Sequence, residues 1–168
     1  MAGIACATAL AACTPALDWR ELPVDDTGLK AMFPCKPDHE TRQVRLAGRP
    51  VSMQALACRS GSSGTFAVLA ADLGSPLDAA RALREWRAAS LARLHAGAAR
   101  VSRFHPRGAQ DLDESVRLVA AGMRADGSKV QSEAAYFAHG RPVFEAVVLA
   151  ARLRPEATQP FFSGLRFE

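Results

Sequence analysis

One long amphipathic helix stands between two groups of short strand-like segments, and this order constrains the fold more than any other feature of the chain. The helix is expected over residues 76–96, because Ser75 is a good N-cap and Pro76 suits the first helical position. One stripe of its surface carries Ala79, Leu83, Trp86, Ser90 and Leu94. A stripe of this kind is expected to pack on a sheet.

The strand-like segments are short and are separated by turn residues. Asp126-Gly127 is a strong hairpin signal between two of them. Strands are expected at residues 19–22, 28–33, 43–46, 51–58, 65–71, 115–124, 129–138, 142–151 and 165–167, and a short helix at 155–162. No long linker interrupts the series. We therefore expect one α+β domain over residues 19–168: a single antiparallel sheet with the long helix on one face, and a short C-terminal helix.

The tetrapeptide Gly-Arg-Pro-Val occurs twice, at residues 48–51 and 140–143, and both copies fall at expected hairpin tips. Arg49 and Arg141 are the candidate partner-binding residues. Both are expected to be exposed and always charged, and the proline that follows each restricts the turn, so that binding orders little further chain. The alternative is that they are solvated turn residues.

Two segments carry a resemblance of fold. Phe33-Pro34-Cys35-Lys36-Pro37 closes the first strand pair, and the chain ends on Phe161-Phe162-Ser163-Gly164-Leu165-Arg166-Phe167. Both are similar to segments of bacterial envelope proteins with the PsbP-like α/β/α sandwich. The resemblance implies that fold over most of residues 18–168, and an assembly or accessory role. It transfers no site residue to this chain.

Leu10-Ala11-Ala12-Cys13 follows an uncharged, mostly apolar run and resembles the lipobox of bacterial lipoproteins. The resemblance implies a signal peptide at residues 1–12, lipidation of Cys13, and an anchor and short linker at 13–18. It places the domain at the membrane through its lipid, facing the periplasm. Thr14 follows the cysteine, so outer-membrane sorting is the default expectation. No Lys or Arg precedes the apolar run, so either the true start lies upstream or the signal is weak. The alternative is an alanine-rich N-terminal helix with a chance match, because alanine is common in this chain.

Two cysteines remain once Cys6 leaves with the signal peptide and Cys13 becomes the anchor. Cys35 and Cys58 are an even pair, as expected of an exported chain with one disulfide. Two alternatives stay open: a zinc site, for which His39 is the only histidine close in sequence, and two free thiols.

No motif of a hydrolase, a nucleotide-binding protein or a metalloenzyme occurs in the chain, and its four histidines lie far apart. The formal net charge is +4, but the basic residues are scattered among acidic ones, which argues against nucleic-acid binding. The sequence therefore predicts no catalytic residue, metal or cofactor. We expect a binding or accessory module with an envelope protein partner. The alternative is an envelope enzyme whose site is assembled from dispersed residues.

Overall fold

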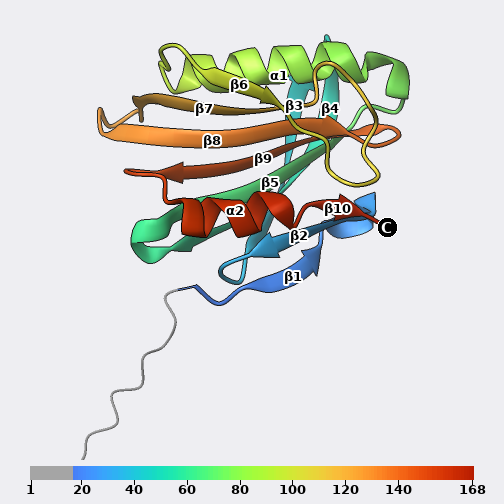
Figure 1. Ribbon diagram of the computed structural model, residues 1–168. Helices are drawn as coiled ribbons and strands as arrows, with labels where there is room; N and C mark the ends of the chain where they lie inside the picture. Colours follow the sequence, from blue (N-terminus) through green and yellow to red (C-terminus); the bar gives the residue numbers. More distant parts are fainter. Residues whose placement is uncertain (1–16) are drawn as a thin grey trace, which may run out of the picture.

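Residues 17–168 form two antiparallel sheets and two α-helices (Figure 1). The computed structural model describes residues 17–168. The larger sheet has seven strands in the order β3-β4-β5-β9-β8-β7-β6, and the smaller has the order β1-β2-β10. The strands are β1 (Arg20–Pro23), β2 (Leu29–Phe33), β3 (Asp38–Leu46), β4 (Arg49–Ser60), β5 (Gly64–Asp72), β6 (Arg100–Arg103), β7 (Val116–Met123), β8 (Lys129–Ala138), β9 (Pro142–Ala150) and β10 (Arg166–Phe167). The helices are α1 (Ala79–Arg93) and α2 (Pro155–Ser163).

The expectation of a single sheet is wrong. Strand β2 pairs with β1 and β10, whereas β3 pairs with β4 in the seven-stranded sheet. The break falls at Pro34 and Pro37, which have no backbone N–H to donate to a neighbouring strand. The fold is mostly β, and the PsbP-like arrangement around one sheet is not what the structure has.

Other elements pack on both faces of the larger sheet. Helix α1 lies on one face, and the three-stranded sheet with α2 lies on the other (Figure 1). The core under the small sheet is rich in aromatic residues, which meet edge to face or stacked: Phe33, Phe66, Phe137, Phe144, Phe161 and Phe162. The core under α1 is built from smaller aliphatic residues around Leu83, Trp86 and Tyr136.

Helix α1 is shorter than the sequence predicts. Pro76–Asp78 is a 3-10 turn, and the Ser75 hydroxyl accepts the Leu77 amide as the expected cap. The predicted stripe is confirmed at Ala79, Leu83 and Trp86, which are buried. The helix ends before Gly97, and neither α-helix nor any other helix of residues 17–168 is long and apolar enough to cross a bilayer.

Candidate binding groove

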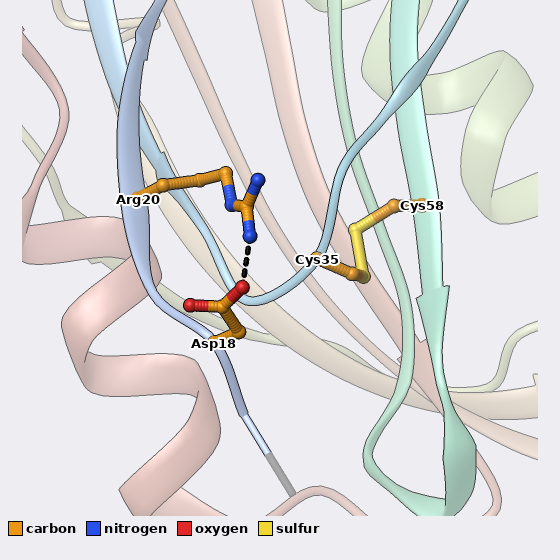
Figure 2. Close-up of a disulfide and its surroundings, with 4 residues drawn as sticks. All are labelled: Asp18, Arg20, Cys35 and Cys58. Atoms are coloured by element: carbon orange, nitrogen blue, oxygen red, sulfur yellow. Dashed lines mark hydrogen bonds and ion pairs between the residues drawn. A yellow bond between two sulfur atoms is a disulfide. The ribbon is translucent and has the colours of Figure 1, made fainter. Parts of the chain in front are cut away.

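The predicted disulfide between Cys35 and Cys58 is confirmed, with the two Cα atoms 5.9 Å apart. Figure 2 shows Cys35 on the segment that leaves β2 and Cys58 on β4, so the bond ties the small sheet to the large one. Beside it, Arg20 pairs with Asp18 at the start of β1 (Figure 2). The disulfide has a structural role and leaves neither thiol free to bind metal. Cys13, the predicted lipidation site, lies outside the described residues.

Arg49 and Arg141 lie at hairpin tips on either side of the loop that leads from β5 to α1. Arg49 pairs with Asp78, and Arg141 pairs with Asp72 at 2.8 Å. The backbone oxygen of Arg141 also accepts the Leu73 amide. Both guanidinium groups therefore already have a carboxylate partner within the chain, and their predicted contact with another protein remains a prediction.

An apolar hollow lies beside α1, over strands that the helix leaves uncovered. Helix α1 packs on β8 and β9 and touches β3, so that the faces of β4 and β5 between them stay partly open. The result is a groove of about 450 Å³. Its floor is formed by Met53, Ala55, Ala57, Ala67 and Leu69, and its walls by Val44, Leu46, Trp86 and Ala89.

The groove is hollow because its floor is built from small side chains. Ala55, Ala57 and Ala67 are only half-buried, and all three line the groove. A volume of this size is within the range of small-molecule sites, which are mostly apolar with a few polar groups at the margin. An apolar ligand would bury this surface and gain roughly 25 cal/mol for each Å² removed from water.

Five charged residues stand at the margin of the groove: Glu40, Arg42, Arg45, Glu85 and Arg93. The two carboxylates are already occupied. Arg42 donates two hydrogen bonds of 2.7 Å to Glu40, and Glu85 accepts from Arg81 at 2.8 Å and from the Ala47 amide at 2.9 Å. These bonds hold the pKa of both carboxyls below its ordinary value. Among residues 17–168, no carboxylate lies within ion-pair distance of Arg45 or Arg93.

A buried carboxyl lies next to the groove floor. Glu145 on β9 is paired in register with Leu69, and its Oε1 accepts a 2.6 Å hydrogen bond from the Tyr136 hydroxyl. Burial raises the pKa of Glu145, against the opposing effects of Tyr136, Ser90, Arg93 and Trp86. Burial beside this carboxyl also raises the pKa of Tyr136. Neither group opens into the groove, so their role is to join α1 to the sheet.

A second hollow, of about 640 Å³, lies on the other face of the sheet next to α2 and is more polar. Two of its three charged residues, Arg117 and Glu133, pair with each other. Arg117 bonds Glu133 at 2.6 Å and lies 4.2 Å from the centre of the Phe162 ring. Because these two charged groups already bond each other, they offer fewer free hydrogen-bonding groups to a ligand. We therefore take the apolar groove as the candidate site. Within residues 17–168, no three His, Cys, Asp or Glu side chains gather closely enough to hold a metal ion.

Part of this site was predictable from the sequence. It placed Met53, Ala55 and Ala57 on one strand face and Trp86 on the sheet-facing side of the helix, but not the hollow between them. Glu145 was missed, although a lone acidic residue in the otherwise apolar run Pro142–Ala150 is a recognisable signal. No family model matches the chain, and no curated protein matches it significantly.

Proposed function

We propose that the chain is a lipid-anchored, periplasm-facing envelope protein that acts as a binding module and has no catalytic activity of its own. The groove beside α1 is the binding site. Cys13 carries the lipid, which anchors the protein in the outer membrane. The observation that carries the proposal is the half-exposed apolar floor of the groove. The Cys35–Cys58 disulfide supports the compartment, since such bonds persist in oxidising environments.

The ionisable residues favour binding over catalysis. An enzyme needs acids or bases that reach the substrate. Glu40 and Glu85 at the groove margin are held by arginines, whereas Glu145 and Tyr136 are buried beneath the floor. This arrangement supports a module that holds a ligand without transforming it.

The edge of the sheet also argues against a partner that binds by adding a strand. Strand β3 is the edge next to the groove, and most of its residues are polar or charged and exposed. Charged side chains on an edge strand discourage pairing with another chain. The groove, and not the backbone of β3, is therefore the recognition surface.

The proposal is tested by filling the groove. The variant Ala57→Leu/Ala67→Leu is expected to abolish the fluorescence gain of Nile red, a neutral apolar dye, and its effect on Trp86 emission. The matched control is Ala88→Leu, which adds the same side chain at an exposed position of α1 that does not line the groove. Undiminished dye binding by a folded Ala57→Leu/Ala67→Leu variant would show that the groove is not the site.

A further inference from the structure

We propose that the ligand of the groove is a single-chain amphiphile with a carboxylate head, and that Arg93 pairs with that head. The inference rests on the proposed function, because it names the ligand class of the same groove. It is carried by the shape of the apolar floor and by the charges at its two ends.

The floor of the groove follows two neighbouring strands, β4 and β5, which keeps it narrow. From Met53 to Ala57 along β4 the floor is about 14 Å long, at about 3.4 Å for each residue of a strand. Its volume of about 450 Å³ is near the lower end of the range for ligand sites. A single extended hydrocarbon chain suits such a slot, whereas a two-chain lipid does not.

One end of the slot is closed by the chain itself. Glu85 accepts the Ala47 amide where β3 turns into β4, and Leu46 lies beside it in the groove wall. Arg93 lies eight residues farther along α1, about 12 Å from Glu85 at 1.5 Å for each residue of a helix. The chain of a ligand would therefore run from the closed end toward Arg93.

The charges at the margin select an anion. Arg93 donates a 3.1 Å hydrogen bond to the Ser90 hydroxyl and its charge acts on the buried Glu145, but no carboxylate of residues 17–168 lies within ion-pair distance of it. A cationic head would meet Arg93 and find both nearby carboxylates, Glu40 and Glu85, already bonded to arginines. A carboxylate would gain a charge-assisted hydrogen bond that Arg93 lacks within the chain.

Two features of the same region bear on this charge balance. Arg93 lies in the last turn of α1, where the helix dipole is equivalent to roughly half a negative charge. The full positive charge of Arg93 is larger than this partial charge. Burial raises the pKa of Glu145 below the floor, and the nearby charge of Arg93 opposes this rise. Arg93 therefore still presents a positive charge to an anionic head.

The test is calorimetric titration of the full chain with Cys13→Ser, so that no attached lipid competes, at about pH 8. The ligands are dodecanoate, dodecanol and dodecyltrimethylammonium, each below its micellar concentration. Dodecanoate is expected to bind about five-fold to ten-fold more tightly than dodecanol, and the cation more weakly than both. Arg93→Gln should bring dodecanoate to the affinity of dodecanol and leave dodecanol unchanged.

The matched control is Arg87→Gln, which removes the same charge from α1 at a position that does not line the groove. It should leave all three affinities as they are. Equal binding of dodecanoate and dodecanol by the unaltered chain, or an equal loss in both arginine variants, would overturn the carboxylate assignment and leave the groove as a binding site. If no ligand binds or displaces Nile red, the single-chain amphiphile is the wrong occupant. If Nile red binds the folded Ala57→Leu/Ala67→Leu variant as well as it binds the unaltered chain, the proposed function is refuted as well.

Discussion

Removal of the Cys35–Cys58 disulfide tests how the two sheets are held together. The two cysteines are 23 residues apart in sequence, and the bond joins the small sheet to β4 of the large one. In the chain-entropy treatment, a closed loop of this length lowers the entropy of the unfolded chain enough to stabilise the fold by about 3.4 kcal/mol at 25 °C. The variant Cys35→Ala/Cys58→Ala should lose about that much unfolding free energy.

The assay is equilibrium unfolding in urea, followed by circular dichroism. A loss of about 3.4 kcal/mol should lower the melting temperature by about 7–14 °C for a domain of this size. The unaltered chain in reducing buffer is the control, and it should match the alanine variant to within about 1 kcal/mol, because alanine adds no polar group at the buried Cys58 position.

Hydrogen exchange adds the spatial part of this prediction. Strands β1 and β2 should lose more protection than β8 and β9, because the disulfide is the only covalent link between the two sheets besides the chain itself within residues 17–168. A loss below about 1 kcal/mol, or a loss of protection spread evenly over both sheets, would refute the reasoning from loop length.

Three further predictions concern single groups. Because folding raises the pKa of Glu145, the stabilisation of its protonated form is complete below the ordinary carboxyl pKa and is lost as the pH rises through the raised one. Between about pH 4 and about pH 8, the unfolding free energy measured in urea should therefore fall less in Glu145→Gln than in the unaltered chain. An equal fall in the two proteins would contradict this prediction. If the hairpin tips form a second surface for a protein partner, separate from the groove, Arg49→Ser/Arg141→Ser should weaken capture of that partner and lower stability by no more than about 1 kcal/mol for each exposed ion pair; unchanged capture by folded protein would exclude the tips as such a surface. Mass spectrometry of protein extracted from native membranes should find a diacylglyceryl adduct on an N-terminal Cys13, and recovery of unmodified residues 1–12 on the intact chain would refute it.

Local chemistry predicted most of the elements. The Asp126-Gly127 turn joins β7 and β8 as expected, with Gly127 at a φ of 80° that favours glycine. Strand β8 has the predicted bounds. Strand β6 was missed because Arg100–Arg103 is short and all four of its residues are exposed, so it carries no apolar alternation.

The division into two sheets could not be predicted in the same way. Alternation along a strand shows which residues share a face, but it does not show which strand lies next to it. Leu29, Ala31 and Phe33 of β2 alternate as a half-buried strand would in either arrangement. The groove has the same difficulty, because it depends on where α1 crosses the sheet and not on any one segment.

The two faces of β4 and β5 show that the hollow is specific to one side of the sheet. The chain is rich in alanine, so small residues at the groove floor would mean little if both faces carried them. The face toward the small sheet instead carries Leu56, Phe66 and Val68, all fully buried. The groove face of the same strands carries Ala55, Ala57 and Ala67, which are half-exposed. Because side chains alternate between faces, the same stretch of backbone has filled one side and left the other open. An apolar surface left open in this way is stabilised when a ligand covers it, which is the physical basis for the proposed binding site.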